Sequence, residues 1–546
     1  MEEKKDQESI RTTCYMCYSC CGIKVQVLDG TVVGIEGDPA NPHNQGKLCA
    51  KGRAGIASLY DPYRVRTPLK RTNPNKGIGV DPGWQEITWE EALATVADKL
   101  KKIRQDDPRK LVIGGLDFHF SFIGAWFASA FGTPNVWKGG ADYYCGNGLH
   151  PITYLTLASF FAEPDLDNCN YCMPIGSQLG FMLNTNAVTL AKKMAEARSR
   201  GLKVVAVDPV GSNAAAKADE WVPIRPGTDS AFVLSMINVL VNELGIYDRD
   251  FLKTHTNAPY LVGADGRYVR DARSGKPLIW DEATGEAQPF DSPLLKAAAL
   301  EGERVINGQA CRPAFELFKK HLGKYAPERT EEITTVPAAT VRRLAREFGQ
   351  AARVGSTIII DGKELPFRPV AATWNRGIAH KGCMMTGQAI QLLNMVVGAL
   401  DVVGGLMGTN PVGPWWKPKQ GPDGLIVPAD MHLILESAFP ARPVAQPETL
   451  ELRELFPVAS YSSPMLEESM LKPDKFGLNY QPEMLILIHS NVMMSTADPK
   501  RMVEVLKKFP YIVSFALQLD ETVELADLVL PDTHYLERMV AFPNRP

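Results

Sequence analysis

The stretch of sequence that decides the fold lies between residues 14 and 55 and reads CYMCYSCCGIKVQVLDGTVVGIEGDPANPHNQGKLCAKGRAG. Four of its cysteines, Cys14, Cys17, Cys21 and Cys49, follow the pattern C-x2-C-x3-C, with 27 residues before the fourth cysteine. Three thiolates in one short loop bind adjacent irons of a cubane, and a distant fourth thiolate completes the ligand set when the chain folds back. The pattern therefore predicts a [4Fe-4S] cluster.

Two alternatives remain open at this loop. Zinc also binds four cysteines, although structural zinc usually takes them as two separated C-x2-C pairs. Cys20 lies beside Cys21, and a C-x2-C-x2-C loop through Cys20 is also typical of clusters, so the third ligand is Cys21 or Cys20, with Cys21 favoured. Elsewhere, Cys169 and Cys172 have C-x2-C spacing without a second pair, which favours core packing.

The segment between the cysteine triplet and Cys49 has the pattern of a β-hairpin. Residues 23–36 alternate apolar and polar side chains on either side of Asp29-Gly30. An Asp-Gly pair between two alternating runs is typical of a two-residue hairpin turn. We expect this hairpin to return Cys49 to the other three cysteines.

The composition excludes several classes of protein. Of the 546 residues, 45% are hydrophobic, and 59 Lys and Arg balance 62 Asp and Glu. Such a chain has material for about three or four domains, and it is not a disordered protein, a collagen or a small disulfide scaffold. The near-neutral balance, without a basic run, indicates that nucleic acid is not a partner.

The sequence predicts a cytoplasmic protein. The charged first ten residues contain neither an apolar core nor a twin-arginine pair, so an export signal of its own is not expected. No uninterrupted apolar run reaches the ~20 residues of a membrane span. Because thiols stay reduced in the cytoplasm, we interpret the cysteines as ligands or core residues and not as disulfides.

Helices and strands alternate along much of the chain. Thr88-Trp-Glu-Glu91 is a capping box, and the helical pattern behind it precedes an apolar strand at 111–115. The same order recurs at 187–199 with 203–207, and at 501–507 with 511–515. This alternation is typical of parallel sheets covered by helices on both faces, which bind ligands beyond the carboxyl ends of their strands. Four candidate ligand-binding residues fall at such ends: Gly176, Asp208, Asn491 and Asp520.

Residues 14–55, ending in Gly46-Lys-Leu-Cys49-Ala-Lys51-Gly-Arg-Ala-Gly55, resemble the amino-terminal cluster domain of one enzyme family. It is the family of molybdenum or tungsten bis-pyranopterin guanine dinucleotide oxidoreductases, the dimethyl sulfoxide reductase superfamily. Later landmarks of that family follow in order at residues 201–209, 218–229, 376–382, 404–405 and 519–531. The resemblance thus extends over nearly the whole chain.

The resemblance, together with the alternation, implies an α/β protein with a small amino-terminal β-rich iron-sulfur domain and two α/β parallel-sheet domains. The expected boundaries are 11–70 for the [4Fe-4S] domain, 71–145 with 365–546 for a discontinuous α/β domain that binds one pterin dinucleotide, and 146–364 for the α/β domain that binds the other, with a hairpin-rich insertion near 258–309. Family members continue into a carboxy-terminal β-barrel domain that covers both pterins. Its apparent absence implies a fragment, a split gene or an incomplete sequence.

The resemblance also implies roles for single residues. Lys51 matches the family's lysine between the cluster and the nearer pterin. Cys145 follows the Phe131-Gly-Thr-Pro-Asn135 motif and matches the protein ligand of the metal, where a soft thiolate suits an ion already bound by four dithiolene sulfurs. His150 is expected to donate or accept a proton near neutral pH, or else to have a structural role beneath the site. The residues expected to bind the two pterin guanine dinucleotides are Gly176, Ser177, Asp208, Asp229, Gly377, His380, Asn491, Asp520 and Thr522.

A cysteine ligand groups the chain with phenylacetyl-CoA:acceptor oxidoreductases, thiosulfate and polysulfide reductases and acetylene hydratases. The implied function is the catalytic subunit of a molybdenum or tungsten oxidoreductase, which carries out two-electron chemistry by oxygen-atom or hydride transfer. Single electrons then pass by way of Lys51 and the cubane. The alternatives are a non-redox hydratase like acetylene hydratase, a thiosulfate or polysulfide reductase subunit, and a non-catalytic electron conduit. Tyr18 stands where such hydratases carry an aspartate, which counts against hydration.

Aromatic residues near the expected site, together with the missing export signal, favour an organic substrate such as a CoA thioester or an aromatic compound. These residues are Trp137, Tyr143, Tyr144, Trp415 and Trp416. The expected partners are this small molecule, an iron-sulfur electron-transfer protein, and a flavin or membrane protein, of which the last would hold a cytoplasmic enzyme at a membrane. Nothing in the sequence distinguishes molybdenum from tungsten.

Overall fold

The computed structural model describes residues 7–17, 19–115, 124, 127–128, 130–137, 148–159, 161–178, 180–181, 187–306, 308–380, 382–409, 444–456, 464–496 and 498–538. The chain forms two compact units. Unit 1 comprises Met1–Leu155, Leu183–Thr189 and Asn410–Pro546, and unit 2 comprises Thr156–Met182 and Leu190–Thr409. Within the described residues, no helix combines the length and the apolar character that a membrane crossing requires.

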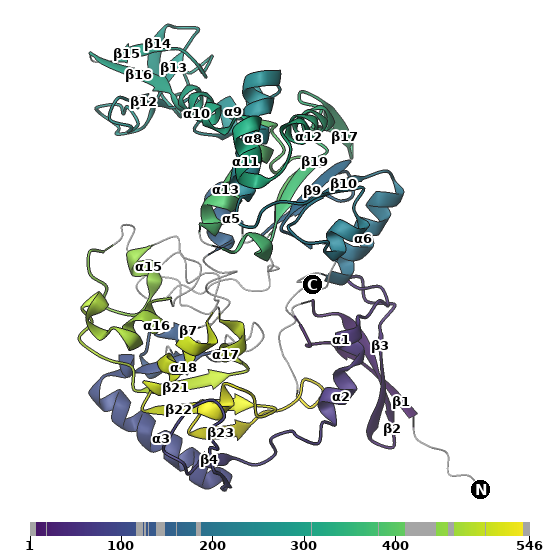
Figure 1. Cartoon of the computed structure of the whole chain (residues 1–546), viewed down its shortest axis with the longest axis vertical. Helices are drawn as coiled ribbons and strands as arrows, with labels where there is room; N and C mark the ends of the chain where they lie inside the picture. Colours follow the sequence, from purple (N-terminus) through teal and green to yellow (C-terminus); the bar gives the residue numbers. More distant parts are fainter. Residues whose placement is uncertain are drawn as a thin grey trace. The chain divides into compact units, whose positions relative to one another are not determined.

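Unit 1 begins with a small antiparallel sheet (Figure 1). Its strands are β1 (Gln7–Thr13), β2 (Gly22–Leu28) and β3 (Thr31–Gly37), in the order β1-β2-β3. Asp29 and Gly30 form the two-residue turn with φ of +48° and +76°, the left-handed conformation that Asp-Gly turns of hairpins adopt. The predicted hairpin is therefore confirmed, and β1 is an additional strand that pairs with β2 along its whole length.

A seven-stranded sheet forms the centre of unit 1, in the order β5-β4-β23-β22-β21-β6-β7. Its strands are β4 (Leu69–Arg71), β5 (Trp84–Glu86), β6 (Leu111–Gly114), β7 (Val136–Trp137), β21 (Met484–Ile488), β22 (Tyr511–Ala516) and β23 (Leu528–Pro531). Strands β23, β22, β21, β6 and β7 are parallel, whereas β4 and β5 continue the sheet antiparallel at one edge. The predicted parallel α/β sheet is thus confirmed for this part of the chain.

Helices cover both faces of this sheet. Successive residues of a strand point to opposite faces, so each face has its own set of packing residues. On one face Leu485 and Leu487 pack with residues of α16 (Pro464–Leu471) and α18 (Pro499–Lys507). On the other face Met484 and Ile486 pack with α3 (Trp89–Asp106). The predicted capping box begins α3: the Thr88 hydroxyl accepts a hydrogen bond from the Glu91 amide at 3.2 Å. The short helices α15 (Leu452–Leu455) and α17 (Val492–Ser495) also belong to this unit.

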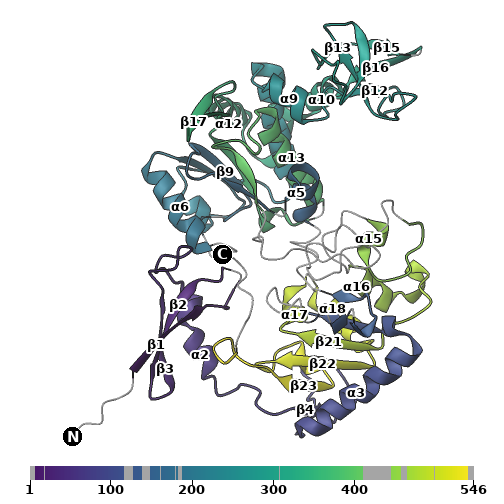
Figure 2. The same ribbon diagram turned by 180° about the vertical axis from the view of Figure 1, so that it is seen from behind.

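Unit 2 is built on a four-stranded, entirely parallel sheet in the order β11-β10-β9-β19. Figure 2 labels β9 within this unit. The strands are β9 (Tyr171–Ile175), β10 (Lys203–Val207), β11 (Glu220–Val222) and β19 (Val370–Trp374). Its principal helices are α8 (Asp229–Asn238), α11 (Pro327–Thr334), α12 (Ala338–Ala351) and α13 (Cys383–Val396). Asn394 ties α13 to β19, since its side-chain amide accepts from the Ala372 N–H at 2.8 Å and donates to the Ala372 carbonyl at 2.9 Å.

The position of β19 changes the domain boundary expected at residue 365. Val370–Trp374 pairs in parallel with β9 over five residues, so residues 365–409 belong to unit 2 and not to the sheet of unit 1. The physical reason is that β19 is buried along its whole length, like the central strands of both sheets, and strand pairing over a long sequence separation decides its place. The short sequence pattern of a buried strand carries no information about its partner.

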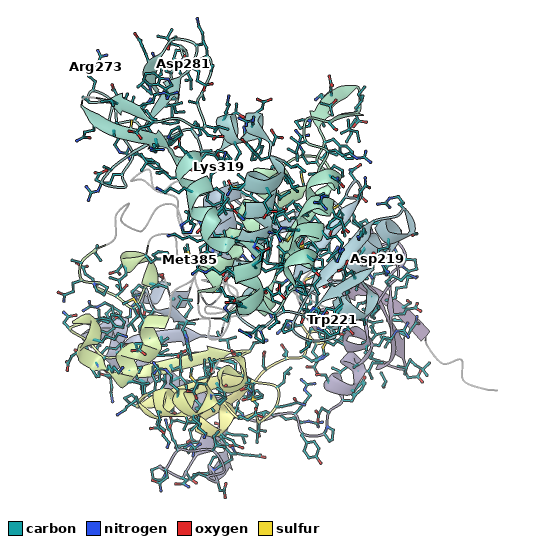
Figure 3. The ribbon with its side chains drawn as sticks, turned by 45° about the horizontal axis from the view of Figure 1, so that its top comes forward. Asp219, Trp221, Arg273, Asp281, Lys319 and Met385 are labelled. Carbon is teal, nitrogen blue, oxygen red and sulfur yellow. The ribbon has the colours of Figure 1, made fainter. Side chains whose placement is uncertain are left out.

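The predicted insertion is present as a set of short hairpins in unit 2 (Figure 3). It consists of β12 (Leu261–Gly263), β13 (Leu278–Asp281), β14 (Glu286–Pro289), β15 (Arg304–Ile306) and β16 (Gln309–Pro313). Asp281 is completely buried, and its carboxylate accepts hydrogen bonds from the amides of Ala283, Lys296 and Ala297. Internal polar contacts of this kind hold a module whose apolar core is small.

The remaining regular elements are shorter or connect the sheets. They are α1 (Ala50–Arg53), α2 (Gly55–Leu59), α5 (His150–Leu157), α6 (Ala187–Ser199), α7 (Asn213–Lys217), α9 (Arg249–His255), α10 (Ala314–Leu322), β8 (Phe161–Pro164), β17 (Thr357–Ile360), β18 (Lys363–Pro366) and β20 (Leu406–Thr409). Cys169 and Cys172 are fully buried at the start of β9, as the core interpretation predicted.

Candidate functional site

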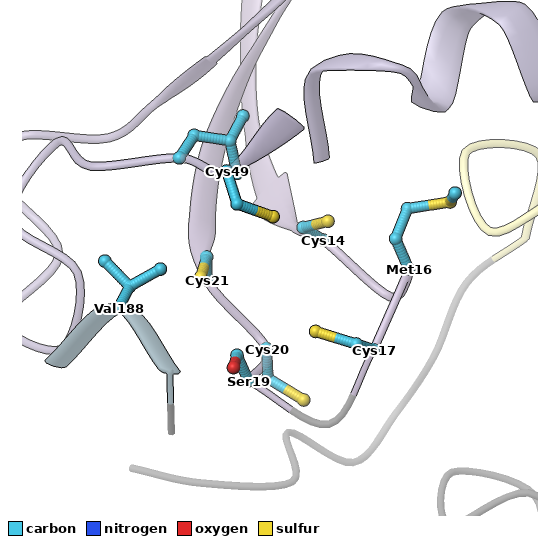
Figure 4. Close-up of a pocket in the computed structure, with 9 residues that line it drawn as sticks. Cys14, Met16, Cys17, Ser19, Cys20, Cys21, Cys49 and Val188 are labelled. Atoms are coloured by element: carbon cyan, nitrogen blue, oxygen red, sulfur yellow. The ribbon is translucent and has the colours of Figure 1, made fainter. Parts of the chain in front are cut away.

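The cysteines of the amino-terminal loop surround one cavity in unit 1 (Figure 4). Its lining residues are Cys14, Met16, Cys17, Ser19, Cys20, Cys21, Leu48, Cys49 and Val188. The hairpin returns the chain to Cys49, as its Asp-Gly turn predicted. The structure thus brings the four predicted ligands together, from a loop and from the residue that precedes α1.

The donor set of the cavity is made of thiols. Four cysteine side chains that line one cavity suit the thiolate ligand set of an iron-sulfur cluster, and their spacing of a triplet and a singlet is the sequence pattern that favours a cluster over zinc. Among the described residues, no group of three or more His, Cys, Asp or Glu side chains is placed to hold a single metal ion.

Burial makes the thiols of Cys14 and Cys21 poor acids. Burial raises the pKa of Cys21 to about 12, and the neighbouring Cys14, Cys17 and Cys49 contribute to this rise through charge repulsion. Burial likewise raises the pKa of Cys14. Cluster insertion must therefore release protons from these thiols, since iron binds the thiolate form.

Cys20 remains an alternative to Cys21 as third ligand. Cys20 lines the same cavity, and its φ of +47° is left-handed, which a residue with a side chain seldom adopts. Cys21 interacts electrostatically with all three other predicted ligands and precedes β2 directly. Both cysteines lie at the cavity, so Cys21 as third ligand, with Cys20 as the alternative, stays a prediction.

Two residues that the sequence analysis did not single out support the cysteine loop. Asn44 is almost completely buried, and its side chain accepts from the Gly22 N–H at 2.8 Å and donates to the carbonyls of Gly22 and Lys47 at 3.0 and 2.7 Å. Thr189 donates to the His43 carbonyl at 2.7 Å, which holds the neighbouring Val188 at the cavity. In a sequence, an asparagine that caps loop carbonyls gives only a weak signal of that role. Val188 gives no sequence signal that it lines a cavity.

Lys51 lies on α1, two residues after Cys49, and is exposed. The next residue, Gly52, is buried: a Cβ there would lie 2.4 Å from Leu48 Cδ1 and 3.4 Å from Cys14 Sγ. Helix α1 therefore passes directly against the cysteine cavity. Its contact face has no room for a side chain, and Lys51 is adjacent to that face.

In unit 2 two glycines meet at the carboxyl ends of β9 and β19. The Gly377 N–H donates to the Gly176 carbonyl at 2.9 Å. Gly176 has a φ of +54°, and a Cβ on Gly377 would lie 2.4 Å from the Gly176 oxygen. Because neither glycine has a side chain, a ligand can come close to the backbone at this edge of the sheet, where such folds bind ligands.

Three polar side chains lie at the same edge of the sheet. Asp208, which follows β10, accepts from the Gln178 side chain at 3.1 Å and from the Val210 N–H at 3.1 Å. Asp229 begins α8, and its charge interacts with that of Asp208. Ser177 is buried beside Gly176. The structure therefore brings together the residues predicted for one dinucleotide site.

His380 completes this group through Asp229. The His380 Nε2 atom lies 3.3 Å from Asp229 Oδ2. Burial raises the pKa of Asp229, and the contact with His380 offsets part of that effect. Two neighbouring carboxylates at a sheet edge suit the N–H groups of a guanine and the hydroxyls of a ribose, which donate hydrogen bonds.

Replacement of Gly377 by alanine tests this edge. The added Cβ would meet backbone atoms of Gly176, which do not move aside cheaply, so we expect the purified chain to lose most of its pterin dinucleotide and to keep its iron. Gly323→Ala is the matched control, because a Cβ at that glycine of unit 2 meets no atom within 4 Å. Nucleotide released by acid and counted per chain is the measurement. Equal nucleotide content in the two variants would contradict the assignment.

The candidates for the second dinucleotide site lie at the carboxyl ends of β21 and β22. The Thr522 hydroxyl donates to Asn491 Oδ1 at 2.8 Å and accepts from the Met493 N–H at 3.0 Å. Asp520 accepts from the amides of Thr522 and Val523 at 2.9 Å each. The three predicted residues are thus neighbours, and in this structure their side chains cap the turns that follow the two strands.

The loop after β23 adds a group of buried residues to unit 1. His489, which follows β21 and has a φ of +54°, contacts the Asp532 carboxylate through Nε2, and Arg538 lies 3.5 Å from the same nitrogen. His534 and Tyr535 follow on the same loop and are buried. No sequence pattern marked these residues, because their importance depends on contacts with distant segments of the chain.

His534 makes the stability of unit 1 depend on pH. Burial and the nearby Arg64 and Arg538 lower the pKa of its imidazole to about 4. An unfolded histidine titrates near 6.5, so the unfolded chain binds the proton first and stability falls as pH drops from about 6.5 to 4. Between pH 7 and pH 5 we expect the free energy of unfolding of wild type to fall by about 2 kcal/mol more than that of a His534→Gln variant. Urea unfolding at both pH values measures it, and equal losses would contradict it.

Several residues named in the sequence analysis lie outside the described part of the chain. These are Tyr18, Tyr143, Tyr144, Cys145, Trp415 and Trp416. His150 begins α5 and is buried, with its ring 6.4 Å from that of Tyr154. The roles of Cys145 and His150 therefore stay predictions.

Comparison with known proteins connects both sites to one family. Residues 64–545 match the family model of molybdopterin oxidoreductases, and residues 7–61 match the Fe4S4 domain of molybdopterin oxidoreductases. The chain belongs to the molybdopterin oxidoreductase family. The superfamily, the [4Fe-4S] cluster and the molybdopterin cofactor that the sequence analysis expected are thereby confirmed.

Individual relatives of this chain are longer proteins. It is 32% identical to a subunit of the sulfite dehydrogenase of Allochromatium vinosum, over 96% of this chain and 58% of that protein. It is also 32% identical to the molybdopterin-containing subunit of the thiosulfate reductase of Salmonella typhimurium, over 45% of this chain and 31% of that protein. The chain therefore spans about three fifths, or less, of the curated relatives it matches.

The fold of this chain is also found in a solved structure. Acetylene hydratase from Pelobacter acetylenicus superposes with a TM-score of 0.66 over 97% of this chain and 63% of that chain, at 22% identity. At this identity the likeness concerns the fold alone. It agrees with the expected mixed architecture of helices and sheets.

Proposed function

We propose that the chain is the catalytic part of a molybdenum or tungsten oxidoreductase that exchanges two electrons with its substrate and passes them on singly through a [4Fe-4S] cluster. The observation that carries the proposal is the cavity lined by Cys14, Cys17, Cys21 and Cys49. A buried cluster relays single electrons between a redox cofactor and an acceptor. Tyr18, at the place in the cluster loop where acetylene hydratase carries an aspartate, counts against the hydratase alternative. We assign the four cysteines as the ligands of the cluster.

The pterin-bound metal supplies the two-electron chemistry when it is present. Lys51, exposed on α1 beside the cysteine cavity, is suited to bind the anionic pterin and to bring it near the cluster. The bare backbone at Gly176 and Gly377 allows the dinucleotide to approach the sheet edge closely, and Asp208 and Asp229 accept hydrogen bonds from its guanosine. Asn491, Asp520 and Thr522 have the corresponding positions for the second dinucleotide.

Cys145 is proposed as the protein ligand of the metal and His150 as the residue that moves a proton at the substrate. A thiolate at that position adds a soft, charged donor, which suits a sulfur-rich centre. His150 is buried at the start of α5, soon after Cys145 in the sequence. An imidazole is the side chain best suited to exchange protons under physiological conditions, and this chemistry supports its role.

For the substrate we propose an oxyanion of sulfur, such as sulfite or thiosulfate. Support comes from the 32% identity to a sulfite dehydrogenase subunit over nearly the whole chain. The aromatic residues that favoured an organic substrate in the sequence analysis give less support to that alternative. Trp137 is 1% exposed and packs in the core of unit 1, and the other four lie outside the described residues. An organic substrate, such as a CoA thioester or an aromatic compound, is the second candidate.

The experiment is anaerobic purification of the full chain with its natural complex, followed by metal analysis and turnover with a dye acceptor. We expect molybdenum or tungsten, about four irons per chain, and dye reduction with sulfite. Dye reduction by an aromatic acid or a thioester, and not by sulfite, would support the organic alternative. Hydration of acetylene without dye reduction would identify a hydratase. Iron without molybdenum or tungsten would identify an electron conduit and overturn the proposal.

The partners belong to the same proposal. Two of the relatives named above are called subunits, and a cluster that collects single electrons requires an acceptor. We propose an iron-sulfur protein as this acceptor, with a flavin or membrane protein beyond it, and a cytoplasmic location. Co-purification with an iron-sulfur protein from the cytoplasmic fraction is the test.

A further inference from the structure

Tyr535 reaches the cysteine cavity from the other end of the chain. It lies on the loop that follows β23 and is 8% exposed, within the apolar cluster that contains Cys14 and Cys21. Its ring packs edge-on against Tyr15 at a centroid distance of 6.5 Å. Gly55, the first residue of α2, faces the phenol, since a Cβ there would lie 2.3 Å from the Tyr535 hydroxyl.

The hydroxyl of Tyr535 is a buried donor without an established acceptor. Within the described part of the chain its oxygen is inaccessible to solvent and makes no regular hydrogen bond. The polar group with which it interacts is the side chain of Cys14. A buried hydroxyl left without an acceptor destabilises the folded state, so an acceptor is expected to be present in the working protein.

A cluster would provide that acceptor. A neutral thiol accepts hydrogen bonds weakly, whereas an iron-bound thiolate carries negative charge and accepts well. Hydrogen bonds to the sulfurs are among the factors that set the potential of an iron-sulfur cluster. The reduced cluster carries one more negative charge than the oxidised cluster, so a donor stabilises the reduced form more strongly.

We propose that Tyr535 donates a hydrogen bond to the Sγ atom of iron-bound Cys14 and thereby raises the reduction potential of the cluster. The proposal rests on the ligand role of Cys14 in the proposed function. Tyr535 is a positioning residue for electron transfer, and it takes no part in the chemistry of the substrate.

The loop that carries Tyr535 is anchored to the iron-sulfur domain by a bidentate ion pair. Arg64 binds both carboxylate oxygens of Glu537, at 2.9 and 2.6 Å, and also donates to the Leu59 carbonyl at the end of α2 at 2.9 Å. Glu537 in turn accepts from the His534 N–H at 2.8 Å. These bonds hold residue 535 against α2 and Cys14, as a fixed donor requires.

The test is the midpoint potential of the cluster in the anaerobically purified full chain, followed by electron paramagnetic resonance during a redox titration. We expect Tyr535→Phe to keep its iron and to change the reduced-to-oxidised ratio at a given potential about tenfold in favour of the oxidised form. This corresponds to about 59 mV toward more negative potential for one electron. An unchanged potential with full iron content would overturn the proposal.

The matched control is Tyr60→Phe, which removes a phenol hydroxyl from the same domain. That hydroxyl accepts from the Val32 N–H at 2.8 Å on the exposed side of β3 and has no place at the cavity. Its removal is expected to leave the potential unchanged. An equal shift in Tyr60→Phe would show a general effect of the domain and would overturn the proposal.

Gly55→Ala provides a second variant if Tyr535→Phe does not assemble a cluster. The new methyl group displaces the Tyr535 hydroxyl and leaves the tyrosine in place, so the potential should again become more negative. The hydroxyl proton should also appear in deuterium exchange as a hyperfine coupling to the cluster in wild type, and be missing in Tyr535→Phe. A coupling that persists in Tyr535→Phe would overturn the proposal. Loss of iron in wild type would instead refute the proposed cluster itself.

Discussion

Alanine in place of Cys21 is expected to remove the iron-sulfur cluster almost completely. Cys21 is 4% exposed, precedes β2 and interacts electrostatically with Cys14, Cys17 and Cys49 across the cavity. A cubane that loses one of four protein thiolates leaves an iron open to solvent. We expect iron to fall from about four atoms per chain to below about one, with loss of the visible absorption of the cluster.

Cys20→Ala is the control for this result. Cys20 lines the same cavity and has the same side chain one position away, so it matches Cys21 in chemistry, burial and surroundings. We expect Cys20→Ala to keep its iron, because the left-handed backbone at residue 20 accommodates alanine as it does cysteine. Iron retained in Cys21→Ala and lost in Cys20→Ala would reverse the assignment of the third ligand.

Replacement of Cys145 by alanine is expected to have the largest effect on turnover. The predicted thiolate bonds directly to the metal, and residues that only orient a metal ligand already cost about 10–100-fold in activity when changed. We therefore expect dye reduction to fall by more than about 100-fold, with iron and pterin contents unchanged. Steady-state kinetics with metal and iron analysis of the same samples is the measurement.

Cys383→Ala is the control for Cys145. Cys383 is a partly buried cysteine at the start of α13, and no role in the site is assigned to it. Its replacement should leave the turnover number within about twofold of wild type, as most substitutions outside a site do. Activity of Cys145→Ala near that of the control, with full metal content, would show that another group binds the metal.

Short-range sequence signals predicted local structure well. Asp29-Gly30 specified the turn of the β2–β3 hairpin, and Thr88 with Glu91 specified the start of α3. Both depend on residues within four positions of each other. The alternation of helices and apolar strands likewise predicted two parallel sheets, since burial on both faces makes a parallel strand apolar throughout.

Long-range pairing was harder to predict. The strand at 370–374 was assigned to the wrong side of the boundary at residue 365, because an apolar pentapeptide fits either sheet equally well. Asn491, Asp520 and Thr522 were expected as cofactor contacts, and the structure shows that they also cap turns through hydrogen bonds with one another. A polar residue after a strand has the same sequence pattern in both roles.

The sequence by itself determined the chemistry of this protein: the cysteine spacing at residues 14–49 and the motifs near 201–229 and 376–382 point to one cofactor system. The tertiary structure alone decided which distant groups surround that system. Tyr535 approaches Cys14, and Gly377 approaches Gly176, across separations of hundreds of residues. The reason is physical: ligand type and spacing are local properties of the chain, whereas the environment of a buried group depends on how separate segments pack.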